Sequence, residues 1–549
     1  MKKNNPDINR LVYILLLIFP VSLYFTGIIL RNVQGPYYLN FYDPSYVYLI
    51  NSLNMAQLSG FGVGHFDHPG TTVQVLGAFT VRIFHLIGQV HSDIAADVLS
   101  RPEAFLHVEN RFFILLNSAA LLFLGIFTFR ITGNVILSLL IQLTPFTSEE
   151  IFYGLIIVTP DNLLVFTSVF LVALLVYYIF RIDIRSDTPF YFIILLALVC
   201  GFGLDTKLNF LPLFVISFFI VKGFKRKMIF TLLTILFFTV FFFPVISNYD
   251  KFLTWIESLF LKSGHYGKGD STVIDTSTFT GNLFLIFKKD KFFLLIYIFT
   301  LITLAVSPVM KLNFSDTARY FRFKKDIKLL TVIFLSVNLH LFLVAKHYAQ
   351  YYMIPSFVLS VFNLVLIVFI WSDYLKKYEI SLRFNAVFLV LILIISVQGF
   401  LKIYYSYYEG EYQKNEAVRI YEYVRNNYVN DLVIPAFGSA NQECALAFGA
   451  SYAASQKSRY NNILSENQKT QFFYNPWSKK LYNISGLSDS EEMQEIKGNY
   501  KRIILQINEY GSVNDFTKLL ESNYGLKNIS ASKVFSNGNK ESVYEIRFD

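Results

Sequence analysis

Long apolar runs fill the first 404 residues of this 549-residue chain and restrict what it can fold into. A bilayer core of about 30 Å needs roughly 20 apolar residues per helix. Charged residues make up 16% of the chain, below the roughly 25% of soluble domains. We therefore expect a polytopic membrane protein with eleven spans, at about 11–30, 110–130, 134–150, 160–180, 189–205, 208–222, 228–247, 292–310, 329–345, 351–371 and 384–404.

The basic residues predict an orientation for these spans. All four basic clusters can be cytoplasmic only if the run 73–90 does not cross the membrane. Arg82 and His85 interrupt that run, so we expect a helix lying on the outer interface. The N-terminus is then inside and the C-terminal tail outside. The four clusters lie at 2–10, 222–227, 311–328 and 376–383.

From residue 405 the composition becomes polar and mixed, with 16 Lys and Arg against 17 Asp and Glu. Strand patterns at 431–437, 501–507 and 542–548, with helical patterns at 414–428 and 514–524, predict a small extracytoplasmic α/β domain. We expect an all-α membrane domain at 1–404 and this domain at 405–549. The chain's net charge of +9 therefore resides in the membrane part, which implies no nucleic-acid partner. Its two cysteines exclude a disulfide framework.

The first predicted outer loop, 31–109, is rich in polar residues, whereas the span centres have almost none. Asp43 precedes Pro44 just before a helical stretch, so it is either a helix N-cap or a catalytic carboxylate. His65, Asp67 and His68 fall within four residues and could bind a metal, although such a triad lacks a fourth ligand. This distribution favours chemistry at the outer interface over transport through the membrane centre.

Five short motifs occur in an order that resembles the GT-C membrane glycosyltransferases, closest to the protein O-mannosyltransferase and lipid A aminoarabinose transferase types. Two positions depart from the pattern, because Gly70 replaces the second proline of a His-Pro-Pro motif and Asp43 lacks an acidic neighbour. The resemblance covers roughly 10–355. The matching positions are Asp43 with His68-Pro69-Gly70, Arg111 at the start of a span, Asp161, Lys207 in GFGLDTKLNFLPL, and AKHYAQYYMIP at 345–355.

The resemblance implies a GT-C fold, and an inverting transfer of a sugar from a polyprenyl-phosphate donor to a glycan, lipid or protein acceptor. It implies an integral cytoplasmic (inner) membrane location and an enzyme that requires no cofactor. Asp43 is the candidate general base, with Asp161 as a second catalytic carboxylate. A divalent metal is compatible with this pattern, and convergence of His65, Asp67 and Asp161 would favour one. Otherwise His65, Asp67 and His68 are substrate-binding candidates. The cations expected to bind the donor phosphate are Lys207, Arg82, Arg111, Lys346 and His347.

Several of these residues also have structural explanations. Arg82 and Arg111 could extend to lipid headgroups, and Lys207 could cap a turn with Asp205. Asp161 suits a helix start, and His347 suits an interfacial aromatic belt.

Two other classes of protein stay open. A transporter or flippase would show broken spans and a polar site at the membrane centre. A polysaccharide polymerase or ligase would have a long late outer loop rich in Arg and His.

Overall fold

The computed structural model is mostly helical, with a small sheet region near the C-terminus. It divides into two compact units. The first unit comprises Met1–Ile28, Phe66–Val73 and Arg111–Tyr404, and the second comprises Ile29–His65, Gln74–Asn110 and Tyr405–Asp549. The structure describes residues 6–40, 42–57, 62–183, 185–264, 269, 272–311, 317–375, 383–467, 472–484, 500 and 502–548.

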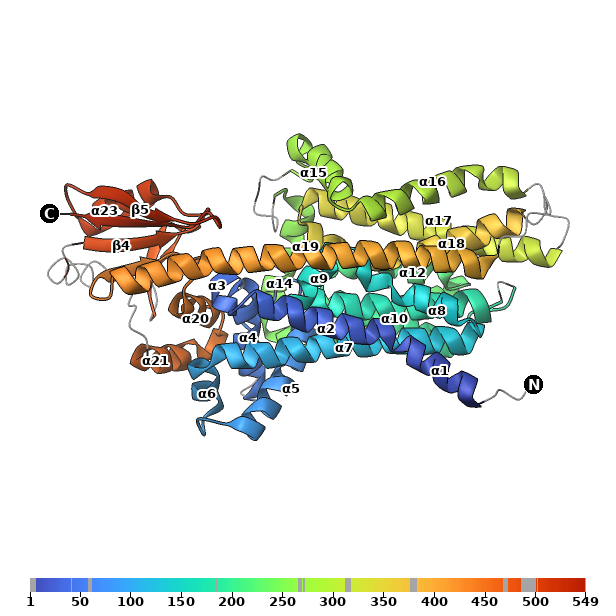
Figure 1. Cartoon of the computed structure of the whole chain (residues 1–549), viewed down its shortest axis with the longest axis horizontal. Coiled ribbons are helices and arrows are strands. Elements are labelled where there is room, and N and C mark those ends of the chain that lie inside the picture. Colours follow the sequence, from blue (N-terminus) through green and yellow to red (C-terminus); the bar gives the residue numbers. More distant parts are fainter. Residues whose placement is uncertain are drawn as a thin grey trace. The chain divides into compact units, whose positions relative to one another are not determined.

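Four helices run through the division along the chain: α2 (Ile18–Val33), α5 (Thr71–Gly88), α7 (Pro102–Thr132) and α19 (Phe384–Asn427). The other helices of the first unit are α1 (Pro6–Leu16), α8 (Val135–Gln142), η1 (Thr144–Phe146), α9 (Glu149–Ile156), α10 (Pro160–Arg181), α11 (Phe190–Thr206), η2 (Leu208–Phe210), α12 (Leu211–Ile220), α13 (Phe224–Phe242), η3 (Phe243–Asn248), α14 (Tyr249–Leu261), α15 (Thr276–Lys289), α16 (Lys291–Lys311), α17 (Thr317–Lys346), η5 (Gln350–Met353) and α18 (Ile354–Leu375). Figure 1 shows them in chain order.

Nine helices in the described part of the chain are long and apolar enough to cross a membrane, so this is an integral membrane protein. Eight of them correspond to predicted spans, and the predicted all-α membrane architecture is confirmed. Two further predicted spans appear as the shorter apolar helices Phe190–Thr206 and Leu208–Ile220. The ninth long helix is Thr71–Gly88, whose predicted place on the interface stays a prediction.

The predicted span over 134–150 is interrupted and does not form one continuous helix. The chain there forms α8, the single turn η1 and the start of α9. Pro145 has no backbone N–H to continue a helix, and it lies in the turn between the two helices. Gln142 at the end of α8 donates to the carbonyls of Leu16 and Leu121, which ties this break to the junction of α1 and α2.

Helix α18 lies at the centre of the first unit, because 94% of its most apolar 18-residue stretch is buried. It contacts α10, α16 and α17 (Figure 1). The membrane part of α19 is the opposite case, because only 17% of its most apolar 18-residue stretch is buried. Its outward side chains, among them Leu393 and Phe400 at 65% and 66% exposure, suit contact with lipid.

The second unit contains a four-stranded sheet in the order β1-β4-β6-β5, in which β1 and β4 are parallel and the other neighbours antiparallel. A separate antiparallel hairpin joins β2 and β3. The strands are β1 (Leu432–Pro435), β2 (Phe472–Asn475), β3 (Lys480–Asn483), β4 (Arg502–Ile507), β5 (Ser530–Ser536) and β6 (Ser542–Arg547). The helices of this unit are α3 (Tyr37–Asn40), α4 (Tyr42–Ala56), α6 (Ile94–Ser100), α20 (Gln442–Ala450), η7 (Ala454–Gln456), α21 (Lys457–Asn467) and α23 (Val513–Tyr524).

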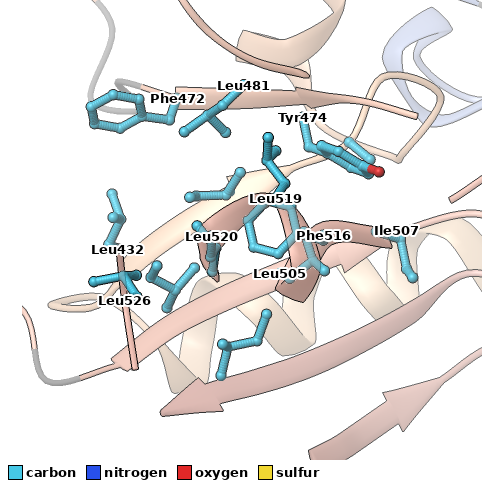
Figure 2. Close-up of a cluster of buried hydrophobic side chains, with 14 residues drawn as sticks. Leu432, Phe472, Tyr474, Leu481, Leu505, Ile507, Phe516, Leu519, Leu520 and Leu526 are labelled. Carbon is cyan, nitrogen blue, oxygen red and sulfur yellow. The ribbon is translucent and has the colours of Figure 1, made fainter. Parts of the chain in front are cut away.

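Strand β4 supplies both faces of the sheet by simple alternation. Ile503 and Leu505 pack with α23 and the β2–β3 hairpin in one buried cluster (Figure 2). Ile504 packs on the other face with Ile420 and Val424 of α19. This alternation is what the period-2 geometry of a strand requires, and the predicted α/β character of this region is confirmed.

The domain boundary at 404–405 remains a prediction. The division into units also changes between Tyr404 and Tyr405, but it assigns two segments of the first predicted outer loop to the second unit as well. Helix α19 continues without interruption across this position, so the predicted tail helix at 414–428 is the end of one 44-residue helix.

Burial of Glu541 makes the stability of the second unit depend on pH. Its carboxyl, 4% exposed, accepts from Gln506 Nε2 at 3.0 Å and the Ala440 N–H at 3.2 Å. Burial raises the pKa of Glu541 to about 7, against the lowering effect of these two hydrogen bonds. Unfolded Glu loses its proton near 4.5, so the folded state binds more protons between these values and stability falls as pH rises.

We therefore expect Glu541→Gln to unfold at a higher temperature than the wild type at pH 8 and at a similar one near pH 5. The amide keeps an acceptor for both donors and removes the buried charge, which corresponds to about 2 to 3 kcal/mol at pH 8. Thermal unfolding of the detergent-purified protein at both pH values measures this. The exposed Glu521→Gln is the control, and an equal effect of Glu541→Gln at both pH values would contradict the prediction.

Candidate functional site

The loop at 68–70 is bonded to the turn that follows α11. The Leu208 N–H donates to the His68 carbonyl, and the Gly70 N–H donates to the Asp205 carbonyl, both at 3.0 Å. The buried Asp205 carboxylate accepts from Thr71 Oγ1 at 2.7 Å and from the Thr72 N–H at 3.2 Å. Asp205 therefore satisfies the free amides at the start of α5 from a position 134 residues away in sequence.

Asp161 and Lys207 form a buried ion pair beside this turn. Lys207 Nζ lies 2.9 Å from Asp161 Oδ1 and 3.1 Å from Oδ2, and both side chains are at most 4% exposed. Asp161 occupies the first turn of α10 and also accepts from Thr159 Oγ1 at 3.1 Å. Lys207 lies between α11 and η2. The sequence suggested that Lys207 caps a turn together with Asp205, but the Lys207 ammonium instead pairs with Asp161.

Two tyrosines of the predicted 345–355 motif cover the Lys207 ammonium. Its Nζ lies 4.9 Å from the ring centre of Tyr351 and 4.6 Å from that of Tyr352. A cation over an aromatic face is attracted by the ring's negative centre, and more so away from water. The ammonium therefore has one anionic partner and two aromatic ring faces around it.

His68 joins the same cluster through Tyr352. Its ring lies 6.4 Å from the Tyr352 ring and 5.5 Å from that of Trp255 on α14. The His68 backbone has φ +98°, a region that side-chain-bearing residues rarely adopt. Such backbone strain concentrates at functional sites. The structure thus brings three predicted site residues together around Tyr352: His68, Asp161 and Lys207.

Lys346 and His347 hold the end of α14 instead of facing the ion pair. Lys346 Nζ donates to the carbonyls of Leu259 and Phe260, at 2.7 Å each. His347 Nε2 contacts the Leu259 carbonyl at 2.8 Å, and Nδ1 contacts that of Gly264 at 2.5 Å. Cations at a helix C-terminus satisfy its free carbonyls and its dipole. Because α14 carries Trp255, these two residues support the wall against which His68 packs.

The remaining predicted residues of the first unit are more exposed. Arg111 is exposed on α7, and Asp67 is partly exposed. Among the described residues, no three His, Cys, Asp or Glu side chains gather as a group that could hold a metal ion. The convergence of His65, Asp67 and Asp161 on a metal, which the sequence left open, is therefore not formed.

In the second unit, Asp43 is exposed where α4 begins, with non-helical backbone angles of −100° and 114°. Tyr42 beside it is buried, its ring 5.5 Å from that of Phe448. The Glu103 carboxylate accepts from the Tyr37 N–H at 2.7 Å and from Tyr46 Oη at 2.7 Å. The segment that carries Asp43 is therefore fixed on both sides by buried contacts.

His65 and Arg82 also lie in the second unit. The His65 ring packs edge-on against Tyr48 and Tyr452, at 5.2 and 5.6 Å. Arg82 is exposed, and its Nε donates to the carbonyl of Ala56 at the end of α4, at 2.6 Å. Among the predicted cations, Arg82 therefore belongs to the group of residues around α4 and α5.

Sequence reasoning missed several residues that build these sites, for different reasons. Asp205 lies in the same motif as Lys207. The two threonines at the start of a predicted helix were a signal that a distant residue could cap this helix. Tyr351 and Tyr352 lie inside the 345–355 motif, but nothing in its pattern indicates that they contact Lys207. Glu103 and Trp255 carried no local signal, since their partners lie far away in sequence.

Neither a known family nor a curated protein matches the chain in sequence. Two solved structures are similar over 97% of both chains: ArnT from Cupriavidus metallidurans bound to undecaprenyl phosphate, with 10% identity and a TM-score of 0.46, and the same protein in the apo state, with 9% and 0.49. The activity proposed for this chain therefore rests on its own residues.

We expect Asp161 and Lys207 to depend on each other for stability. Asp161→Asn or Lys207→Met alone leaves a buried charge without its partner, which costs about 3 kcal/mol. The double variant should be clearly more stable than the sum of the two losses predicts. Thermal unfolding in detergent measures all three. The exposed pair Lys540 and Glu509, 2.6 Å apart, is the control, with an expected coupling below about 1 kcal/mol. Additive losses at the buried pair would refute its role.

Proposed function

We propose that this protein is a membrane glycosyltransferase that transfers a sugar from a polyprenyl-phosphate donor to an acceptor at the outer face of the membrane. The observation that carries the proposal is the Asp161–Lys207 pair, buried at helix ends and covered by Tyr351 and Tyr352. A buried ammonium at the end of a span suits a lipid-linked anion, because the ligand's chain stays in the bilayer while its charge reaches the cation.

Lys207 has the chemistry that a phosphate leaving group needs. As the bond from sugar to phosphate breaks, negative charge grows on the phosphate oxygens, and a fixed cation there stabilises the transition state. Asp161 then acts as a positioning residue that holds Nζ in place until the phosphate arrives. His68 and Trp255, which pack beside Tyr352, supply ring surfaces suited to a sugar.

Asp43 has the chemistry that the acceptor needs. It is an exposed carboxylate on a segment fixed by Glu103 and by the buried Tyr42. A carboxylate can take the proton of an acceptor hydroxyl that attacks the sugar from the face opposite the phosphate, which inverts the anomeric configuration. The proposed acceptor is a glycan, a lipid or a protein.

The proposed location is the cytoplasmic membrane, with the N-terminus inside and the residues from 405 outside. The distribution of Lys and Arg supports this orientation. In this proposed orientation, the donor and acceptor sites lie at the outer face of the membrane, where the proposed acceptor is.

We expect polyprenyl phosphate, or one polyprenyl-phosphate sugar, to raise the unfolding temperature of the detergent-purified protein. A ligand that binds only the folded state stabilises it by about 2.7 kcal/mol at a hundredfold excess over Kd. Lys207→Gln should need at least tenfold more ligand to reach the same rise in unfolding temperature. The exposed Lys251→Gln should need the same ligand concentration as the wild type. No shift with any carrier would favour the polymerase and transporter interpretations.

We expect Asp43→Asn to abolish sugar transfer while donor binding stays nearly intact. The amide cannot accept the acceptor's proton but occupies the same exposed position. Radiolabelled transfer and the donor-induced thermal shift, measured on the same preparation, separate the two steps. Asp250→Asn, an exposed carboxylate on α14, is the matched control. Full transfer by Asp43→Asn would remove Asp43 from the mechanism.

A further inference from the structure

A cavity of about 460 Å³ lies in the second unit, whereas Lys207, the cation of the proposed donor site, belongs to the first unit. Ligand sites commonly have volumes of roughly 300 to 1,000 Å³. Its lining comes from α4, α5, the start of α6, and α21, and includes Gln57, Arg82, His85, Leu86, Asp93 and Arg459. Two guanidinium groups and an imidazole thus face one carboxylate.

Both arginines are held by hydrogen bonds to other residues of the lining. Arg82 donates through Nε to the Ala56 carbonyl. Arg459 Nη2 lies 2.6 Å from Asp93 Oδ1, and its Nη1 donates to Gln57 Oε1 at 2.5 Å. Each arginine carries five N–H donors, so these contacts leave further donors on both. Planar guanidinium groups are the side chains best suited to bind phosphate with paired hydrogen bonds.

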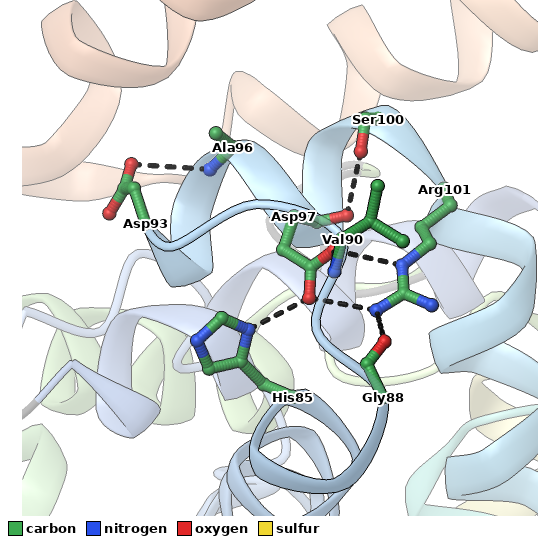
Figure 3. A network of polar contacts seen from close by, with 8 residues as sticks. All are labelled: His85, Gly88, Val90, Asp93, Ala96, Asp97, Ser100 and Arg101. Atoms are coloured by element: carbon green, nitrogen blue, oxygen red, sulfur yellow. Dashed lines mark hydrogen bonds and ion pairs between the residues drawn. The ribbon is translucent and has the colours of Figure 1, made fainter.

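His85 is held in a defined orientation by a network at the start of α6 (Figure 3). Its Nδ1 lies 2.8 Å from Asp97 Oδ2, and Asp97 is also bonded to Arg101 and to the Val90 N–H. Burial would raise the pKa of Asp97, but the hydrogen bonds from Arg101, His85 and Val90 outweigh it and lower the pKa to about 2. A carboxylate that stays charged orients the His85 ring through Nδ1, and in the protonated ring the Nε2–H is a further donor that a phosphate oxygen can accept.

The face of α5 beside the cavity is apolar and exposed. Leu86, which lines the cavity, is 75% exposed, and Ile87 is 81% exposed. Ile83 and Phe79, one and two turns earlier, continue the same face at 40% and 54%. Helix α5 is also apolar and long enough to lie in a bilayer. An acyl chain is the partner that such a stripe suits.

We propose that this cavity binds the phosphate headgroup of an anionic membrane lipid, with Arg82, Arg459 and His85 on the phosphate and the acyl chains along Leu86 and Ile87. The proposal does not rest on the proposed glycosyl transfer. It gives Arg82 a phosphate other than the donor's, because Arg82 shares its cavity with Arg459 whereas Lys207 belongs to the first unit.

The test measures binding of dioctanoyl phosphatidic acid to the full-length protein in detergent. Arg82→Gln and Arg459→Gln should each raise Kd at least tenfold, and Arg82→Lys should have an intermediate effect. Arg419→Gln, which alters an equally close ion pair elsewhere in the second unit, should leave Kd unchanged. Equal affinity of all four variants and the wild type would overturn the proposal.

A gain of affinity separates the proposal from simple loss of structure. Asp93→Asn removes the carboxylate that competes for Arg459, so it should tighten phosphatidic acid binding severalfold. Weaker or unchanged binding by a variant that unfolds like the wild type would contradict the assigned role of Arg459.

Three further arms identify the ligand. Inorganic phosphate should bind at least tenfold more weakly than phosphatidic acid, and Leu86→Ser with Ile87→Ser should remove that difference. Dioctanoylglycerol, which lacks the phosphate, should not bind. Lys207→Gln should leave phosphatidic acid binding unchanged. Equal binding of inorganic phosphate overturns the lipid, equal binding of dioctanoylglycerol overturns the anion, and loss in Lys207→Gln overturns the separate site.

Discussion

Hydrocarbon offers no hydrogen-bond partner to a peptide group, and this constraint decides where polar contacts occur in the first unit. Long helices satisfy their own backbone, so side chains with charge gather where helices begin and end. Asp161 lies in the first turn of α10, Lys207 directly after α11, and Lys346 at the end of α17. The candidate donor site is thus composed of helix ends, and it carries charge where the ends of several spans meet.

Buried carboxylates contribute to this architecture in two ways. Asp161 neutralises a buried ammonium, which by itself would oppose folding. Glu103 and Asp205 instead accept from amides at the starts of α3 and α5, helices that precede them by many residues. A distant carboxylate in this position does what a local N-cap does, and it also fixes one segment against another. The catalytic candidates Asp43 and Lys207 each lie close to such a carboxylate.

How far the sequence could predict this structure depended on the range of the interaction involved. Apolar runs are local, so α10, α16 and α18 were predictable, and even the break at Pro145 had a local cause that the continuous apolar pattern obscured. Asp161 and Lys207 were identified by their motifs, but their pairing across 46 residues was not, because a pattern does not show which side chains meet. For the same reason, no pattern in the sequence shows that Arg82 and Arg459 line one cavity. The binding of Lys346 to carbonyls of α14 depended on where that helix ends, which no pattern near Lys346 shows.

The capping of α5 by Asp205 has a consequence for how this protein can change during evolution. The carboxylate, the Thr71 hydroxyl and the Thr72 amide form one hydrogen-bonded unit, and its members are encoded far apart. Loss of the carboxylate leaves buried donors unsatisfied, and loss of the hydroxyl leaves the buried carboxylate with one donor fewer. Positions 71 and 205 should therefore vary together among relatives, and this covariation would be visible in an alignment even where overall identity is too low to show common ancestry.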